Sequence, residues 1–297
     1  MDHTGPSWDL YRTFLAVLRE GSLSGAARSL GLTQPTVGRH IEALEQAVGF
    51  QLFTRSQRGL AATEAALELR PYAEALSSTA ASLLRAASGQ GGAVKGTVRV
   101  SASEVMGVEV LPPILAALHE RYPELVIELS LSNAVEDLLR RDADIAVRMV
   151  EPSQEALVVR RLGTVSLGLH AHRRYLDRRG TPKRLEDLAA HSVIGPDRGT
   201  PAIRSMLKRV PRFDVTRFAL RTDSDLAHLA AIRAGFGIGI CQVALARRDR
   251  HLVRVLPEAF ELKLGTWLAM HENLRSTPRC RIVFDALAAG LKEHVER

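Results

Sequence analysis

Glycines divide the first part of the chain into short segments. Residues 7–62 carry short helical patterns, which are interrupted at Gly21, Gly31, Gly49 and Gly59. Residues 63–88 are rich in Ala, Leu and Glu and contain no glycine, and the run Ser88-Gly-Gln-Gly-Gly92 then forms a flexible joint. From Lys95 onward, β-like runs such as 97–103, 126–131 and 145–147 alternate with amphipathic ones. This order predicts a small helical domain, a long helix and an α/β domain with parallel strands.

Composition excludes several classes of protein. The length of 297 residues predicts two domains, or three, and 46% apolar residues are typical of a globular chain. The most apolar stretch, Ala234 to Ala246, is too short for a membrane helix, and the first residues lack the pattern of a secretory signal. Two cysteines, Cys241 and Cys280, exclude a disulfide framework and a Cys-rich zinc site. We therefore expect a cytoplasmic protein with no membrane partner.

The positive charge does not by itself locate a nucleic-acid surface. The formal net charge is +7, yet residues 1–93 hold eight arginines and eight acidic side chains, which cancel. The excess lies entirely in the remainder of the chain. Local arrangement has to decide where a nucleic acid would bind.

The first helical patterns have the spacing of a helix-turn-helix. Within Trp8–Glu20, one face carries Leu10, Phe14, Val17 and Leu18, and Gly21 ends the helix. Ser22 can cap a second helix in which the small side chains Ala26 and Ala27 allow close packing, and Gly31-Leu32 makes the turn.

A third helix is predicted after Thr33, which is a good N-cap, with Pro35 tolerated in its first turn. One face buries Val37, Ile41, Leu44 and Val48, and the other face carries Gln34, Thr36, Gly38, Arg39 and His40. Early positions of the second helix of a helix-turn-helix are those that meet base edges. Residues 52–55 and 60–63 then predict a β-hairpin, with Arg55 and Arg58 near a DNA backbone.

Amphipathic helices alone would equally suit a module that binds protein. The run FLAVLREGSLSGAARSLGLTQPTVGRHIEALEQAVGFQLFTR, however, closely resembles the winged helix-turn-helix of LysR-type transcriptional regulators. Gly38 departs from the family, in which serine is frequent at this position, so Arg39 and His40 are expected to weigh more in the choice of sequence. The resemblance implies DNA contacts by Ser22, Gln34, Pro35, Thr36, Gly38, Arg39, His40, Arg55 and Arg58.

The glycine-free segment predicts a long helix that begins at Thr63-Glu64-Ala65. Its apolar side chains Leu69, Tyr72, Leu76 and Leu83 have heptad-like spacing. They could pack on the helix's own domain, whereas the resemblance implies an antiparallel dimerisation helix and a homodimer or homotetramer. Pro71 is expected to kink this helix or delay its start.

Residues 94–297 resemble the effector domain of the same family, through RVSAS, LPPILAALHERYPELVIEL, SNAVEDLLRRDADIAVRM and AAIRAGFGIGICQVAL. The resemblance implies two α/β lobes, as in type 2 periplasmic binding proteins, with crossing strands near Thr164–Leu169 and Leu264–Met270. The expected domains are 1–63 for DNA binding, 64–93 for the linker helix and hinge, and 94–297 for the effector. Lobe I would comprise 94–165 and 268–297, and lobe II 166–267.

Ligands of open α/β sheets bind at the carboxyl ends of the strands, near helix N-termini. This rule selects an effector site made of Ser101, Ser103, Asn133, Arg148, Pro196, Thr200, Asp223 and Ser224. Helix capping could equally explain Ser101, Asn133, Asp223 and Ser224, and Arg148 could form a structural ion pair with Asp144. Because Arg148 can bind a carboxylate with both arms of its guanidinium, we expect a small organic anion as effector.

The sequence gives little support for further binding or reactive sites. Gly235–Gly239 lacks the spacing of a phosphate loop and more simply lets a strand pass close to a helix. His170 and His172 have no accompanying carboxylates or thiols, so no metal is expected, and the two thiols are expected to be buried and inert.

The sequence discriminates among three classes of function. An enzyme is disfavoured because no nucleophile elbow, metal triad or nucleotide motif is present. A solute-binding transport component is disfavoured by the helix-turn-helix segment and by the lack of a signal. The sequence thus predicts a transcriptional regulator without a cofactor, which binds an interrupted inverted repeat in double-stranded DNA and a small-molecule effector, with RNA polymerase as a further partner.

Overall fold

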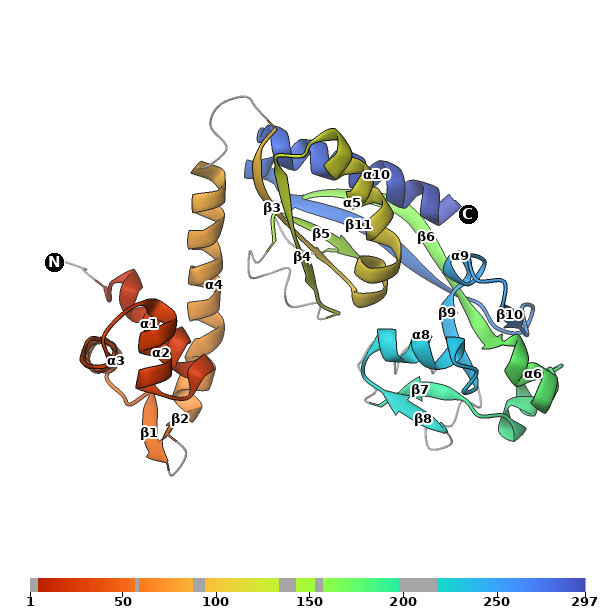
Figure 1. Cartoon of the computed structure of the whole chain (residues 1–297), viewed down its shortest axis with the longest axis horizontal. Helices are drawn as coiled ribbons and strands as arrows, with labels where there is room; N and C mark the ends of the chain where they lie inside the picture. The colour runs from red at the N-terminus through yellow and green to blue at the C-terminus, as the bar shows by residue number, and fades with distance from the viewer. Residues whose placement is uncertain are drawn as a thin grey trace. The chain divides into compact units, whose positions relative to one another are not determined.

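The computed structural model describes residues 5–56, 59–87, 94–133, 143–152, 157–197 and 218–296. The chain forms two compact units, the first of which reaches Leu84. Figure 1 shows the helices and strands of each unit. In the described part of the chain, no helix has both the length and the apolar character required to cross a bilayer.

The first unit begins with the predicted helix-turn-helix. It contains α1 (Trp8–Glu20), α2 (Leu23–Leu30) and α3 (Gln34–Val48), followed by the hairpin of β1 (Phe53–Ser56) and β2 (Gly59–Ala62). The side chains of Ser22 and Thr33 cap α2 and α3, accepting hydrogen bonds from the N–H groups of Gly25 and Thr36 at 3.1 and 3.4 Å. Both capping predictions are therefore confirmed, as is the predicted hairpin.

A glycine fixes the hairpin against the turn between α1 and α2. Gly59 has φ +124°, and a Cβ atom there would lie 2.6 Å from the carbonyl oxygen of Gly21. That same oxygen accepts a hydrogen bond of 2.9 Å from the N–H of Leu60. Only glycine satisfies both the backbone conformation and the close approach.

The long helix α4 (Glu64–Ala87) starts where the sequence predicts, so of the two effects expected from Pro71 the delayed start is wrong and the kink stays a prediction. Ala66 and Ala73, on either side of Pro71, are buried in the core of the helix-turn-helix, and this packing holds the first turns in place. Leu69 packs on the same core. Tyr72, Leu76 and Leu83 are instead exposed, so only part of the predicted stripe is left uncovered.

In the second unit, lobe I is built on parallel strands. β3 (Gly96–Ala102) lies between β4 (Leu125–Leu131) and β5 (Ile145–Arg148), and it is parallel to both. The π-helical turn η1 (Met106–Val110) leads into α5 (Leu111–Arg121), and α5 and α10 (Pro278–Glu296) pack with these strands around one core. All three strands place their carboxyl ends at the same edge of the sheet.

Two long strands lead from lobe I into lobe II. β6 (Leu157–His172) pairs antiparallel with β11 (Leu262–His271), and β11 also pairs antiparallel with β5. Beyond the crossing, β6 pairs antiparallel with β9 (Ile238–Gln242) and β10 (Leu252–Val255). The predicted crossings are confirmed. The expectation of parallel strands is wrong for this part, because β6 and β11 run directly between the lobes in opposite directions, and β9 and β10 then pair antiparallel with β6.

The remaining elements belong to lobe II, apart from η5 (Glu272–Leu274). They are α6 (Arg173–Arg179), η3 (Leu185–Ala190), β7 (Ile194–Pro196) parallel to β8 (Leu220–Thr222), α8 (Asp225–Arg233) and α9 (Val243–Ala246). A Cβ atom at Gly239 would lie 2.6 Å from His228 of α8. The interpretation of Gly235–Gly239 as a close strand–helix contact is thus confirmed.

Candidate nucleic-acid interface and interlobe site

The N-terminal end of α3 presents several of the predicted DNA-contacting side chains. Gln34, Pro35 and Arg39 are exposed, and Thr36 and Gly38 are partly buried. Ser24 of α2 donates a hydrogen bond of 3.0 Å to Gln34 Oε1. Ser24 was missed in the sequence because its contact with α3 depends on how α2 and α3 cross.

His40 is turned back toward α1. Its Nδ1 lies 2.9 Å from Thr13 Oγ1, and the Thr13 hydroxyl already donates to the carbonyl oxygen of Asp9 at 2.7 Å. The His40 Nδ1–H is therefore the donor in this contact, and in the neutral imidazole Nε2 is then the acceptor. His40 is consequently a half-buried side chain with one acceptor, and not a freely exposed one.

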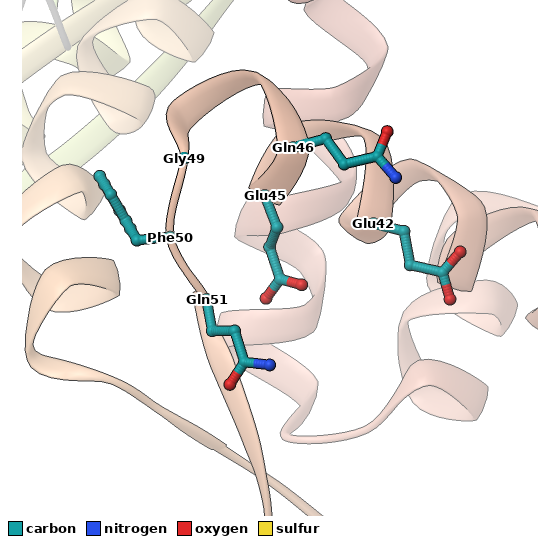
Figure 2. A pocket seen from close by; sticks show the side chains of 6 residues that line it. All are labelled: Glu42, Glu45, Gln46, Gly49, Phe50 and Gln51. Atoms are coloured by element: carbon teal, nitrogen blue, oxygen red, sulfur yellow. The ribbon is translucent and has the colours of Figure 1, made fainter.

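The hairpin is held on α3 by a carboxylate. Glu45 Oε1 accepts hydrogen bonds from the N–H groups of Leu52 and Phe53 at 2.6 and 3.2 Å. Figure 2 shows Glu45 among the residues of an open pocket where α3 ends and the chain turns toward β1. Arg55 of β1 is exposed, while Arg58 lies outside the described residues. Ser22 serves as the cap of α2.

At the edge of the lobe I sheet, two predicted effector residues meet. Arg148 is buried, and its Nη2 donates a hydrogen bond of 2.7 Å to Ser101 Oγ, while Nη1 donates to the carbonyl oxygen of Val147 at 3.0 Å. Asp144 is also buried, and its Oδ2 accepts from the N–H of Arg99 at 2.8 Å. Ser101 lies within β3, where its hydroxyl oxygen accepts from the Arg148 guanidinium, so it does not cap a helix.

A second cluster joins the two lobes through Glu104, which was missed in the sequence. Asn133 Oδ1 accepts from the N–H of Glu104 at 3.0 Å. The Glu104 carboxylate accepts from Ser224 Oγ at 3.1 Å and from the N–H of Leu226 at 3.4 Å. The carboxylate of one lobe therefore sits at the N-terminus of α8 in the other, where unpaired N–H groups favour negative charge.

Ser224 caps α8 as the alternative interpretation predicted, since its Oγ also accepts from the N–H of Ala227 at 3.3 Å. Asn133 Nδ2 donates to Asp225 Oδ2 at 3.0 Å, which makes a second contact between the lobes. The pKa of Asp225 is raised, first by desolvation of its carboxyl and second by the charge of Glu104. Asp225 thus adds a second acidic group that the sequence did not suggest as part of the site.

The other predicted effector residues take no part in the side-chain hydrogen bonds described above. Ser103 is half-buried, Pro196 ends β7, and Asp223 is exposed just before α8. Thr200, with the rest of the 196–201 loop beyond Asp197, lies outside the described residues. Ser101 and Arg148 therefore form one group, and Asn133 and Ser224 form another through Glu104.

Charged contacts also join the lobes beside η1. Arg233 of α8 donates to both carboxylate oxygens of Glu109, at 2.6 and 2.8 Å. This hydrogen bond is the main cause that lowers the pKa of Glu109. Arg248 donates to the carbonyl oxygen of Glu109 at 3.0 Å, so that two arginines of lobe II bind the same short segment of lobe I.

The remaining candidate chemistry is structural. Cys241 and Cys280 are both buried, and burial raises the pKa of the Cys241 thiol to about 12, which keeps it protonated and inert. His170 Nδ1 lies 2.9 Å from the carbonyl oxygen of Gly168, and His172 caps α6. Among the described residues, no group of three His, Cys, Asp or Glu side chains could hold a metal ion.

Two family models match the chain. The model described as "LysR substrate binding domain" matches residues 91–292, and "Bacterial regulatory helix-turn-helix protein, lysR family" matches residues 8–67. The probable HTH-type transcriptional regulator LtrA of Klebsiella pneumoniae is 26% identical over 283 residues, 93% of this chain and 92% of that protein. An HTH-type transcriptional regulator of Xanthomonas campestris pv. campestris is 29% identical over 181 residues, 61% of this chain and 53% of that protein.

A solved structure has the same fold. Full-length CbnR complexed with its target DNA superposes with a TM-score of 0.64 at 21% identity, over 98% of this chain and 99% of that one. At this level of identity the likeness concerns the fold alone.

Proposed function

Because the chain belongs to the LysR family of transcriptional regulators, whose members named above are regulators and not enzymes, we propose that it binds promoter DNA through α3 and the β1–β2 hairpin. The observation that supports this most directly is the exposed N-terminal end of α3, where Gln34 and Arg39 face solvent on a helix fixed by Thr33. A helix placed in this way can enter a major groove. Arg39 would bind base edges, and Arg55 would bind phosphate.

The test is a binding experiment with DNA from upstream of the chain's own gene. Arg39→Ala is expected to relax the base preference and to cost about 1–3 kcal/mol at the best site. Arg55→Ala should weaken binding to all sequences alike and flatten its salt dependence. Arg275→Ala, an exposed arginine of lobe I, serves as the control. Unchanged base preference in a folded Arg39→Ala protein would contradict the placement.

We also infer that two copies pair through α4. Tyr72, Leu76 and Leu83 are exposed to 72, 47 and 67%, a large apolar surface for one side of a helix. We call the unit from α1 to β2 the DNA-binding head. Two paired heads would need an inverted repeat whose half-sites are separated by one or more turns of DNA, with roughly 10 bp in each turn. Sedimentation of the wild type and of Leu76→Glu tests this, and a wild-type monomer at micromolar concentration with full DNA binding would refute it.

For the effector we propose a small organic anion bound between the lobes, within the domain limits 94–165 and 268–297 for lobe I and 166–267 for lobe II. The support is the buried guanidinium of Arg148 together with the N-terminus of α8, where the N–H of Leu226 already donates to the Glu104 carboxylate. An anion that replaced Glu104 there would make contacts with both lobes. It would then favour one arrangement of the lobes over another, as a regulating ligand must.

A thermal-shift screen with small carboxylates tests the effector, because a ligand that binds only the folded state raises its stability. The shift given by a hit should disappear in Arg148→Ala and weaken in Arg148→Lys, which keeps the charge without the planar fork. DNA binding without ligand should remain in both variants. A shift that survives Arg148→Ala would show that this arginine does not bind the anion.

A further inference from the structure

The excess positive charge of the chain is concentrated in one lobe. Residues 1–93 carry eight basic and eight acidic side chains, and lobe I carries 13 basic and 15 acidic ones. Lobe II, residues 166–267, carries 19 basic and 10 acidic side chains. The segment 1–93, which includes the DNA-binding head, therefore has no net charge, so the attraction of the head to DNA depends on the local placement of its arginines, and the net positive charge of the chain lies elsewhere.

Within the described part of lobe II, the basic residues are densest around α6. Residues 173–184 contain six basic side chains and a single acidic one, Asp177. All six are exposed, namely Arg173, Arg174, Arg178, Arg179, Lys183 and Arg184. We refer to residues 173–184 as the basic segment.

Three of these six side chains have structural partners. Arg174 and Arg178 donate to the carbonyl oxygens of Ala234 and Gly235, at 2.9 and 3.5 Å, near the C-terminus of α8. Arg184 Nε donates to Asp187 Oδ1 at 3.1 Å. These internal contacts account for the positions of the Arg174, Arg178 and Arg184 side chains, so no external partner is needed for these three.

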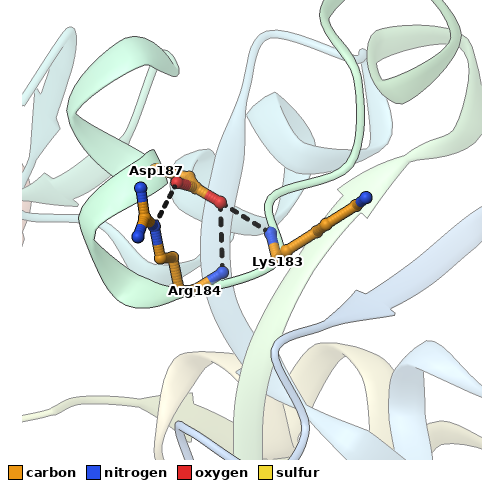
Figure 3. Close-up of polar contacts among 3 residues, drawn as sticks. All are labelled: Lys183, Arg184 and Asp187. Carbon is orange, nitrogen blue, oxygen red and sulfur yellow. Dashed lines mark hydrogen bonds and ion pairs between the residues drawn. The ribbon is translucent and has the colours of Figure 1, made fainter.

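The other three basic side chains have no such explanation. Lys183 gives Asp187 only its backbone N–H, at 2.9 Å, and Figure 3 shows its ammonium group extending away from that carboxylate. Within the described residues, the side chains of Arg173 and Arg179 likewise make no hydrogen bond or ion pair. Three cations are thus held at the surface around one short helix with their charge available to a partner.

We propose that the basic segment is a second DNA-contacting surface, which binds the phosphate backbone of the DNA held by the helix-turn-helix. This inference rests on the proposed DNA binding. The head supplies the base contacts and the phosphate contact of Arg55, and lobe II adds further non-specific contacts with phosphate. Two of the three available cations, Arg173 and Arg179, are arginines, whose planar guanidinium suits phosphate oxygens.

DNA is favoured over an acidic protein partner for two reasons. First, DNA bound by the head is held on the same chain as lobe II, which raises its effective concentration at that lobe. Second, a stable protein interface needs apolar or aromatic anchors at its centre. The large apolar side chains of the basic segment, Tyr175 and Leu176, are both buried. A surface of charges without anchors suits a phosphate backbone.

The test compares two full-length variants with the same change of charge. One carries Arg173→Glu, Arg179→Glu and Lys183→Glu. The control carries Lys95→Glu, Arg160→Glu and Arg275→Glu, three exposed cations of lobe I that make no side-chain hydrogen bond or ion pair in the described structure. Binding to a long fragment from upstream of the gene, and to unrelated DNA of equal length, is measured over a salt series. Circular dichroism verifies that both variants are folded.

The lobe II variant is expected to bind both fragments at least about ten-fold more weakly than the control. The slope of its log affinity against log salt concentration should be smaller by about 2–3, because each lost phosphate contact removes about 0.9 from that slope. Equal slopes and affinities in the two variants would overturn the proposal and leave an acidic protein as the alternative. Failure of the proposed DNA binding would look different, because the wild type would then not distinguish its upstream DNA from unrelated DNA.

Discussion

The helix-turn-helix head and the two-lobed domain differ in the contacts that stabilise each of them internally. In the head, the hydrogen bonds that cap α2 and α3 join residues three apart, as in Ser22–Gly25 and Thr33–Thr36, and Ser24–Gln34 spans only ten positions. Between the lobes, the contacts join residues far apart in the chain, as in Glu104–Ser224 and Glu109–Arg233.

The head and the lobe interface also differ in polarity, and this difference suits a rigid head and a lobe interface that can rearrange. An apolar core such as that of Phe14, Val17 and Leu44 resists deformation, so the head can present α3 in one orientation. Polar contacts between lobes can exchange with water or ligand at small net cost. The head is therefore built to be rigid, and the lobe interface is built to be rearranged.

The largest effect expected is on the pH dependence of lobe II. Burial lowers the pKa values of His170 and His228 to about 4, from 6.5. Between pH 6.5 and 4 the unfolded chain binds protons that the folded lobe does not, so stability falls as pH falls. Each histidine contributes about 1.4 kcal/mol per pH unit, or about 4 kcal/mol for both at pH 5.

Urea unfolding at pH 7 and pH 5 measures this loss. His228→Gln, which can still accept from the N–H of Ile240, should lose less stability than the wild type on acidification. His119→Gln, at an exposed site of α5, should behave as the wild type. An equal loss in His228→Gln and wild type would show that the ring is not buried in its neutral form.

The second effect tests the rigidity of the head. Gly59→Ala combines φ +124° with a contact of 2.6 Å to Gly21 O, and it should cost about 2–4 kcal/mol and weaken DNA binding. Gly31→Ala is the matched control, because φ there is +66° and nothing lies within 4 Å of the added Cβ. Its cost should be about 1 kcal/mol. Equal costs in urea unfolding would mean that the hairpin can shift away from α1.

A contact between the lobes should give a smaller effect. Glu109→Gln and Arg233→Met are expected to show a coupling of about 1 kcal/mol in a double-mutant cycle, since both partners are partly exposed. The Glu109 contribution is present above pH 4.5 and is lost as pH falls through the lowered pKa of the folded state. A coupling near zero at pH 7 would show that this pair does not hold the lobes.

The same contrast explains what the sequence could predict. The caps Ser22 and Thr33 were found because their partners lie within one helical turn, and the crossing strands were found through family resemblance. Glu104 was missed because its partners are 120 and 122 positions away, so no local pattern marks it. His40 was placed on the exposed face, yet its bond to Thr13 depends on the packing of α3 on α1.

The smallest effect concerns Gly38, where the family frequently has serine. A Cβ atom at Gly38 would lie 3.9 Å from Leu23 Cδ1, an ordinary contact, and the backbone there is helical. Gly38→Ser should therefore stabilise the head by about 0.5 kcal/mol through helix propensity. Gly38→Ala provides the control, because it gains helix propensity without the hydroxyl.

Any difference between the two variants in affinity for the upstream DNA then isolates the hydroxyl. One added hydrogen bond of about 1 kcal/mol would make Gly38→Ser bind about five-fold more tightly than Gly38→Ala. If both variants instead lost DNA binding while their urea unfolding showed the expected gain, the backbone at Gly38 would itself lie against the DNA. The rigid head would then read DNA by close approach of α3 at this position, with no room for a side chain.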